Sequence, residues 1–326
     1  MPVNEQSQVG EARRRVARLA SLVGFDEQDT GKLSIVASEL ATNLVKHTQD
    51  GGTLVVQEYL PEQSIDILSL NKKPGTNNPD RWLKDGYSTS NTLGTGLGAV
   101  SRLSYEFDLY SDLNTGTIVS AKLITGKGPS ERFFDVGVVS IPIPEEVVCG
   151  DSWFIHQERD NLSAMVADGL GHGIEARDAS RAACDIFKEN VFGDPVKTIE
   201  KIHKGLKYTR GAAVSIIQIY PSQNKIIFAG VGNISVAVEN ELGRRHFVPD
   251  NGTAGFQMRK VRLSEMDWSR ESIAVMHSDG CASSWNLNSY PGLRQKSSPI
   301  VAGCLFRDFS KTHDDCTVVA LQQRRS

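Results

Sequence analysis

Several aspartates lie at the ends of apolar runs in the C-terminal part of the sequence. Asp151 stands in VVCGDSWF, Asp168 in LSAMVADGLGHG and Asp279 in SIAVMHSDG, while Asp314 and Asp315 come directly before CTVVAL. Such runs are typical of strands, and a rigid sheet can direct carboxylates from several strands toward one point. A single Asp-Gly is more often a turn or a cap. A convergent set would repel itself and would need cations, and oxygen ligands favour Mg²⁺ or Mn²⁺.

Divalent ions held by such a set could activate a water molecule for hydrolysis. Water shared by two divalent ions can lose a proton near pH 7, against about 15.7 in bulk, so no side-chain nucleophile is needed. The histidines beside the motifs, His172, His277 and His313, are as readily hydrogen-bonding supports as proton donors, and none is assigned as a general acid. The small residues after GHG predict a helix packed tightly against the sheet: Ala176, Ala179, Ala182 and Ala183.

The motifs GD, ADGLGHG, HSDG and HDDCTVVAL, in that order, resemble those of the SpoIIE-type serine phosphatases, a branch of the type 2C metal-dependent phosphatases. The resemblance covers about residues 132–322. VCGDSWF, DGLGHG and AGVGNISV are most similar to the stressosome feedback phosphatases within that branch. The resemblance implies an αββα sandwich, a serine/threonine phosphatase activity on proteins, and a supporting polar role for Asp315.

The same resemblance implies a catalytic and metal-binding role for each of the other aspartates. Asp168 would bridge two Mn²⁺ or Mg²⁺ ions, and the carbonyl of Gly169 would contact one of them. Asp279 and Asp314 would hold the other ion. Asp151 would occupy the first acidic position of the family.

The N-terminal part contains a helix-like pattern that carries a carboxylate and an amide one turn apart. Apolar residues recur at spacings of three and four between Asp29 and Thr48, which predicts a helix with one buried face. Glu39 and Asn43 are four residues apart and would stack on that helix, where one ligand could meet both. An isolated pair of this kind is more often a solvated helix edge.

Two β-like segments, GGTLVVQEYL and SIDILSL, and a glycine-rich stretch follow this helix. Gly94, Gly96 and Gly98 precede the apolar segment AVSRLSYEF, so the backbone there could approach phosphates at a helix start. A glycine cluster alone is equally consistent with a flexible loop, and its spacing differs from the dinucleotide and Walker patterns.

SELATNLVKH, DGYSTSNTLGTGLGAV and NTGTIVSAKL, in that order, resemble the ATP-binding fold of histidine kinases and anti-sigma-factor kinases, particularly the switch kinases of bacterial stressosomes. The resemblance covers about residues 10–125 and implies an α/β sandwich that binds MgATP. It maps the magnesium-binding Asn onto Asn43 and the base onto Glu39. Gly94, Gly96 and Gly98 would line the lid over the phosphates, and Thr117 would lie near the adenine.

The adenine-reading loop departs from the pattern of that family. The family has Asp followed by Gly-x-Gly, whereas this chain has Asn71, two lysines, a proline and Gly75. A neutral amide carbonyl in place of a carboxylate would lose on the order of 1 kcal/mol in the hydrogen bond to the adenine amino group. The N-terminal part is therefore an active serine kinase, a weak nucleotide sensor or a docking module, and the asparagine favours regulation or docking.

Length and composition predict two cytoplasmic domains. The chain has 326 residues, 39% of them hydrophobic, and a formal charge of −3, which does not suggest a nucleic-acid-binding surface. No apolar stretch is long enough for a membrane span, and five cysteines without a CxxC spacing indicate reduced thiols. The segment LITGKGPSERF is the predicted linker, which gives a kinase-like domain at 1–127 and a phosphatase domain at 128–326.

The combined hypothesis is an α+β, two-domain phosphatase of a bacterial partner-switching pathway. Its expected substrate is a phosphorylated STAS-domain protein, as both resemblances imply. Two alternatives remain open: a non-enzymatic, anti-sigma-like binding protein, and a hydrolase of small phosphate esters, because specificity depends on loops that the sequence does not place.

Overall fold

The protein forms two compact units in a computed structural model that describes residues 1–48, 50–59, 63–72, 75–83, 96–126 and 132–324. Unit 1 comprises Met1–Ser130 together with Asn286–Arg307, and unit 2 comprises Glu131–Trp285 together with Asp308–Ser326. The domain boundary predicted between residues 127 and 128 lies outside the described residues and stays a prediction.

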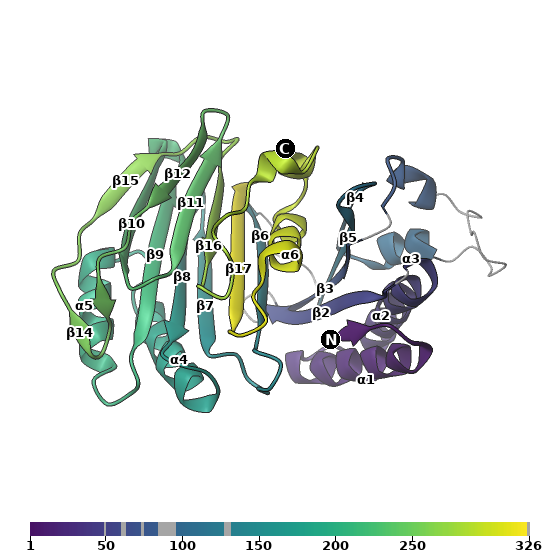
Figure 1. The fold of residues 1–326 in the computed structure, drawn as a ribbon, viewed down its shortest axis with the longest axis horizontal. Helices are drawn as coiled ribbons and strands as arrows, with labels where there is room; N and C mark the ends of the chain where they lie inside the picture. Colours follow the sequence, from purple (N-terminus) through teal and green to yellow (C-terminus); the bar gives the residue numbers. More distant parts are fainter. Residues whose placement is uncertain (49, 60–62, 73–74, 84–95, 127–131, 325–326) are drawn as a thin grey trace. The chain divides into compact units, whose positions relative to one another are not determined.

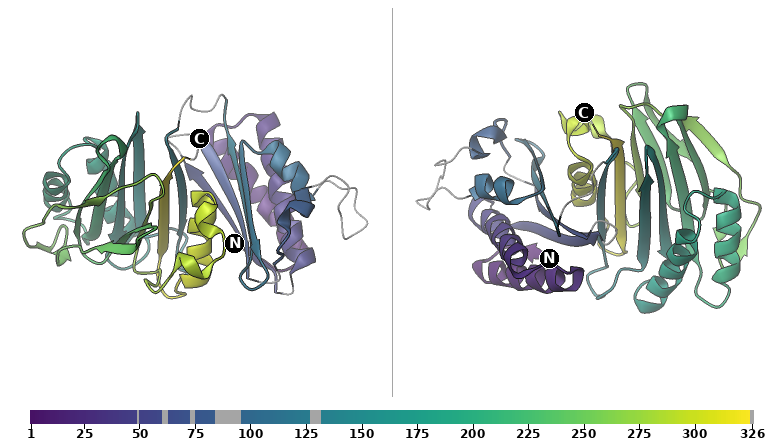
Figure 2. Two further views of the ribbon diagram at one scale, coloured as in Figure 1. Left: turned by 90° about the horizontal axis from the view of Figure 1, so that it is seen from above. Right: turned by 180° about the vertical axis from the view of Figure 1, so that it is seen from behind.

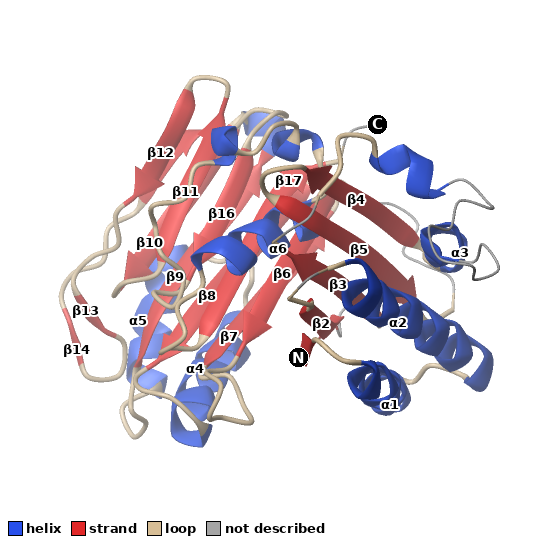
Figure 3. Ribbon diagram, turned by 45° about the vertical axis from the view of Figure 1, so that its right-hand side comes forward, coloured by secondary structure: helices blue, strands red, loops and turns tan. Residues whose placement is uncertain are grey.

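Unit 1 contains a five-stranded antiparallel sheet in the order β1-β2-β3-β5-β4, with helices against one face (Figure 3). The strands are β1 (Pro2–Val3), β2 (Gly52–Tyr59), β3 (Ser64–Asn71), β4 (Glu106–Asp112) and β5 (Gly116–Ile124). The helices in chain order are α1 (Gln6–Val23), α2 (Glu27–His47), the 3₁₀ helix η2 (Pro79–Leu83) and α3 (Gly96–Leu103).

Helix α2 begins at Glu27, two residues before the pattern that predicts it. The Asp26 side chain caps it by accepting a hydrogen bond of 2.7 Å from the backbone N–H of Asp29. The apolar positions that predicted this helix, Leu33, Val36, Leu40 and Leu44, are all buried. They pack with α1 and with the residues of β3 and β5 that point the same way, such as Ile67 and Val119.

The opposite face of this sheet is covered by the segment Asn286–Arg307, which carries η4 (Leu287–Ser289), η5 (Leu293–Gln295) and most of α6 (Ser298–Phe309). Strand β3 is consequently buried along its whole length. Gly303 lies so close that an added Cβ would be 3.0 Å from Leu70 and 3.2 Å from Leu68. Residues far apart in sequence thus complete unit 1.

Polar contacts fix this segment at both ends. The backbone N–H of Ser297 and the Lys296 ammonium donate to the Asp108 carboxylate at 2.7 and 3.2 Å. At the other end the Arg307 guanidinium, which is 9% exposed, donates to the Asn71 carbonyl at 3.0 Å. A charged group buried so deeply is retained only when it is hydrogen-bonded in this way.

Unit 2 is a sandwich of two five-stranded sheets. The first has the order β15-β10-β9-β8-β7 and the second β12-β11-β16-β17-β6 (Figure 1). Their strands are β6 (Phe134–Ile141), β7 (Asp151–Glu158), β8 (Asn161–Gly169), β9 (Ala212–Tyr220), β10 (Lys225–Val231), β11 (Ser235–Asn240), β12 (Gly243–Phe247), β15 (Ser264–Asp267), β16 (Ile273–His277) and β17 (Cys316–Gln323). The remaining elements are β13 (Gly252–Thr253), β14 (Gln257–Met258) and the 3₁₀ helix η3 (Pro221–Gln223).

The main core of unit 2 lies between the two sheets, where side chains such as Val166 and Val319 are fully buried. Helices α4 (Ile174–Lys188) and α5 (Pro195–Gly205) cover the outer face of the first sheet (Figure 2). Ala176, Ala179 and Ala183 on α4 are buried, which confirms the tight packing that the small residues predict. The predicted α+β class with two domains is confirmed.

The structure also bears on membrane-spanning helices and on the cysteines. Within the described residues, no helix combines the length and the apolar character that a membrane crossing demands. The five cysteines are free, as predicted for reduced thiols.

Candidate active site

Asp151 and Asp168 face each other on neighbouring strands. Asp151 is the first residue of β7 and Asp168 the last but one of β8, and the antiparallel register pairs them directly. Their carboxyl groups are close enough to share a hydrogen bond. The Ser278 hydroxyl donates to Asp151 Oδ2 at 2.7 Å. With both carboxylates ionised, Asp151 Oδ1 is buried without a hydrogen-bond partner among the described residues, as expected of an oxygen that faces a cation.

Asp279 and Asp314 form a second pair at the ends of two other neighbouring strands. Asp279 follows β16 and Asp314 precedes β17, and these strands pair from His277 and Val318 onward. Their side chains are also within hydrogen-bonding reach of each other. The Asn233 amide donates to Asp279 Oδ2 at 2.7 Å and thereby orients this carboxylate.

The two pairs interact electrostatically. Burial, followed by the charges of Asp151, Asp279 and Asp314, raises the pKa of Asp168 to about 9. Burial likewise raises the pKa of Asp151 to about 7, and burial together with Asp279 raises the pKa of Asp314. The protein alone therefore disfavours the ionised state, and bound cations would remove that cost.

The residues fit a pair of divalent ions that keep much of their water. No group of three or more His, Cys, Asp or Glu side chains in the described part of the chain converges closely enough to hold an ion by itself. Mg²⁺ typically keeps several waters and binds one or two carboxylates, so two carboxylate pairs suit it. Gly169, whose carbonyl is the predicted ligand, lies next to Asp168 and packs so closely against α4 that a Cβ would be 1.9 Å from the Ala176 carbonyl oxygen.

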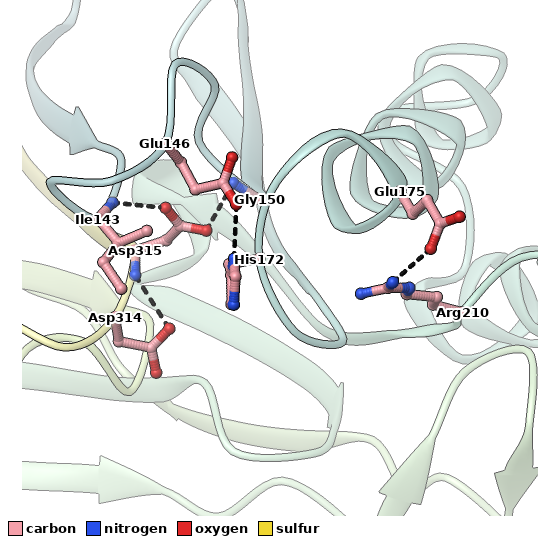
Figure 4. Close-up of polar contacts among 8 residues, drawn as sticks. All are labelled: Ile143, Glu146, Gly150, His172, Glu175, Arg210, Asp314 and Asp315. Atoms are coloured by element: carbon pink, nitrogen blue, oxygen red, sulfur yellow. Dashed lines mark hydrogen bonds and ion pairs between the residues drawn. The ribbon is translucent and has the colours of Figure 1, made fainter.

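Asp315 supports the loop that precedes Asp151, as the resemblance implied. Its carboxylate accepts hydrogen bonds from the backbone N–H groups of Ile143 and Gly150, both at 2.8 Å (Figure 4). The side chain is 3% exposed. The Asp314 carboxylate accepts from the Asp315 N–H at 2.9 Å. The two adjacent aspartates therefore have different roles. Asp315 holds the loop, and Asp314 lies beside Asp279.

The three histidines occupy different environments. His277 is buried, burial lowers its pKa, and its ring bonds to the Ser278 carbonyl at 2.9 Å while Nε2 accepts from the Trp285 indole at 3.2 Å. Its role is structural. His172 contacts Glu146 Oε1 at 2.7 Å on the surface, and His313 lies next to Asp314.

In unit 1 the residues predicted to bind nucleotide come from helix α2 and from two neighbouring strands of the sheet. Glu39 and Asn43 are half-buried and one turn apart on α2. Asn71, at the end of β3, is paired in register with Thr117 on β5, and both are buried. Because Asn71 and Thr117 are an even number of residues from Ile67 and Val119, they point toward the helical face of the sheet.

Two of the three predicted glycines lie at a helix start, as the sequence predicts. Gly96 and Gly98 lie within the first turn of α3, while Gly94 lies outside the described residues. Gly75 packs against the turn between β4 and β5, where a Cβ would be 1.8 Å from the Asp112 carbonyl oxygen. The helix therefore begins before the apolar segment and includes two of the three glycines.

The side chains that orient the aspartates are not identifiable from residue spacing. Lys311 lies in none of the quoted motifs, and Ser278 and Asn233 lie inside HSDG and AGVGNISV, whose spacing does not reveal their contacts. Lys311 donates to the Asp279 carbonyl at 2.6 Å. The roles of these residues depend on long-range contacts, which only the folded chain reveals.

A two-sheet sandwich with helices outside and paired aspartates at its strand ends defines a protein serine/threonine phosphatase domain of the type 2C class. It is joined here to a kinase-like ATPase domain. Residues 3–123 match the family described as "Histidine kinase-like ATPase domain".

Comparison with known proteins gives one relative for each part of the chain. The serine/threonine-protein kinase RsbT of Bacillus subtilis (strain 168) is 32% identical over 111 residues, which is 34% of this chain and 84% of the relative. The phosphoserine phosphatase RsbX of the same organism is 29% identical over 134 residues, which is 41% of this chain and 67% of the relative. Through its N-terminal part the chain belongs to the family of RsbT.

A solved structure agrees with the phosphatase fold. The crystal structure of RsbX in complex with magnesium has a TM-score of 0.53 and 25% sequence identity, and the match covers 60% of this chain and 98% of that one. The predicted fusion of a kinase-like domain and a type 2C phosphatase domain is confirmed.

Proposed function

We propose that the chain uses two Mg²⁺ or Mn²⁺ ions to dephosphorylate a STAS-domain phosphoprotein in a bacterial partner-switching pathway in the cytoplasm. The observation that carries the proposal is the meeting of Asp151 with Asp168, and of Asp279 with Asp314, at the ends of neighbouring strands. The likeness to a phosphoserine phosphatase and to a partner-switching kinase supports the substrate class.

Each aspartate has a separate task in this proposal. Asp168 and the Gly169 carbonyl would hold one ion, and Asp279 with Asp314 would hold the other, with Asp168 placed to serve both. Asp151, which is fixed by the Ser278 hydroxyl, has a further oxygen that could accept a hydrogen bond from metal-bound water. The bound ions supply positive charge for the phosphoryl oxygens and acidify the attacking water. The carboxylates orient those ions and hold the negative charge that retains them.

A test of phosphatase activity uses the full chain and p-nitrophenyl phosphate with Mn²⁺. We expect hydrolysis that EDTA abolishes and that Asp168→Ala reduces by at least about a hundredfold, because this residue contacts both ions. Asp267→Ala, at an exposed aspartate on β15, is the matched control. Equal rates in the two variants would refute the proposed site.

The two alternatives predict other results. A non-enzymatic antagonist would bind its partner without any metal-dependent hydrolysis. A hydrolase of small esters would release phosphate from p-nitrophenyl phosphate without inhibition by a phosphorylated STAS-domain protein. Competition between the two substrates in one reaction separates a protein phosphatase from an enzyme for small esters.

We infer that unit 1 binds MgATP weakly and acts in regulation or docking rather than as a kinase. Asn71 in the adenine-reading position favours this view. The assay mixes full-length protein carrying Asp168→Ala, which prevents dephosphorylation, with radiolabelled MgATP and a STAS-domain protein. We expect no phosphate transfer, and a nucleotide affinity that Asn43→Ala lowers. Transfer that Asn43→Ala abolishes would make unit 1 a kinase.

A further inference from the structure

Two surface segments lie beside the end of β8 that carries Asp168. Gly169 pairs with Ala212 on β9, and Ala212 in turn forms a β-bridge with Ala254. The first segment, residues 204–210, runs up to β9, and the second, residues 256–262, follows Ala254. The first segment therefore ends, and the second begins, within a few residues of the backbone next to the active site.

The two segments are also next to each other. Gly255 packs against the backbone of Leu206, where an added Cβ would be 2.8 Å from the Leu206 carbonyl oxygen. The N–H of Gly255 donates to His203 Nδ1 at 3.1 Å. Gly211 likewise packs against Ala254, where an added Cβ would be 2.6 Å from the Ala254 carbonyl oxygen. These contacts hold the second segment against the first one.

Each segment exposes an aromatic side chain. Tyr208 is fully exposed and Phe256 is 82% exposed. Leu170 and Ile174, which flank the loop after Asp168, are 43% and 62% exposed. Single exposed apolar residues are ordinary, but several around one site are typical of a surface that binds another protein.

All charged residues in the two segments are basic. Lys204, Lys207 and Arg210 lie in KGLKYTR, Arg259, Lys260 and Arg262 lie in FQMRKVR, and neither segment contains an acidic residue. Arg210 pairs with Glu175, and Arg262 pairs with Asp250 at 2.8 Å. Within the described residues, Lys207 and Arg259 have no ion pair and are exposed.

We propose that Lys207, Tyr208, Phe256 and Arg259, here called the rim, dock an acidic segment of the phosphoprotein substrate that has an aliphatic side chain near its phosphoserine. The inference rests on the proposed phosphatase function and adds the chemistry of the substrate. A basic rim beside the site attracts an acidic segment of the substrate and steers its phosphoserine toward the aspartates and their ions. The aromatic rings provide the apolar contact.

The test compares two phosphoserine peptides of equal length with the full chain and Mn²⁺. One peptide has aspartates and a leucine around the phosphoserine, and the other has asparagines in place of the aspartates. We expect kcat/KM to favour the acidic peptide about tenfold, since each exposed ion pair contributes up to roughly fivefold. Lys207→Glu combined with Arg259→Glu should remove this preference.

Hydrolysis of p-nitrophenyl phosphate should stay within about twofold in this double variant, because a small ester does not reach the rim. Arg159→Glu is the matched control, since Arg159 lies in the turn between β7 and β8 at the end opposite Asp151. The pair Lys207→Ala with Arg259→Ala gives the same readout if the reversed charges disturb folding. Higher salt should reduce the preference.

The aromatic contribution is measured separately with Tyr208→Ala and Phe256→Ala. Both side chains are exposed, so we expect KM for the acidic peptide to rise several-fold with kcat unchanged. The proposal is overturned if the wild type does not distinguish the peptides, or if the preference survives in the charge variants. An inactive wild type with p-nitrophenyl phosphate would instead refute the phosphatase function itself.

Discussion

Replacement of Asp168 by Asn should stabilise the metal-free protein at alkaline pH while it abolishes activity. Burial and three neighbouring aspartates raise the pKa of Asp168 from 3.8 to about 9. Between these two values the folded protein holds a proton that the unfolded chain has released. The free energy of unfolding therefore falls as pH rises through this range.

The magnitude follows from the linkage relation. One proton corresponds to about 1.4 kcal/mol per pH unit, so the metal-free protein should lose on the order of 3 kcal/mol between pH 6 and pH 8. For a unit of this size, that corresponds to a decrease in Tm of roughly 5 to 10 °C. The amide of Asp168→Asn does not titrate, so the variant should lose less. Asp151, with a pKa of about 7, should leave part of the pH dependence in place.

The assay is thermal unfolding in EDTA at pH 6 and pH 8, followed by the same measurement with Mn²⁺. Bound Mn²⁺ should restore the wild-type Tm at pH 8 and should have a smaller effect on Asp168→Asn. Asp267→Asn, at an exposed aspartate, serves as the control and should behave as the wild type. If the Tm of the wild type and the Tm of Asp168→Asn decrease equally between pH 6 and pH 8 in EDTA, the reasoning is refuted. The carboxylates are then not crowded and do not require cations.

Three further predictions concern the elements that support the two units. Asp315→Asn should destabilise unit 2 by about 2 to 4 kcal/mol in urea unfolding and should raise the Mn²⁺ concentration needed for activity, because Gly150 loses a charged hydrogen-bond acceptor. Gly303→Val should lower the stability of unit 1 by about 1 to 3 kcal/mol in urea unfolding, because a Cβ would already be 3.0 Å from Leu70. A fragment of residues 1–127 lacks the segment Asn286–Arg307, which covers one face of β3. It should therefore bind an apolar dye such as ANS more strongly than the full chain does.

The aspartates were predictable because they lie at the ends of strands, most of which are strongly apolar. A strand ending at Gly169 or starting at Cys316 fixes where the neighbouring carboxylate lies. By contrast, Asn233 approaches Asp279 from the connection between β10 and β11, and its place in AGVGNISV does not reveal this contact. Contacts of this kind depend on register across several strands, which is a property of the whole sheet.

The inserted segment was equally inaccessible from sequence, and it determines which parts of the chain can be separated. Asn286–Arg307 lies between Asp279 and Asp314 in the sequence, yet it belongs to unit 1, where Arg307 binds the Asn71 carbonyl. A fragment cut at residue 127 would lack this segment on the sheet face that holds Leu68, and a buried apolar surface would be exposed to water. Loss of nucleotide binding in such a fragment would then reflect damaged packing. Kinase and phosphatase activities are therefore best separated by Asp168→Ala and Asn43→Ala in the intact chain.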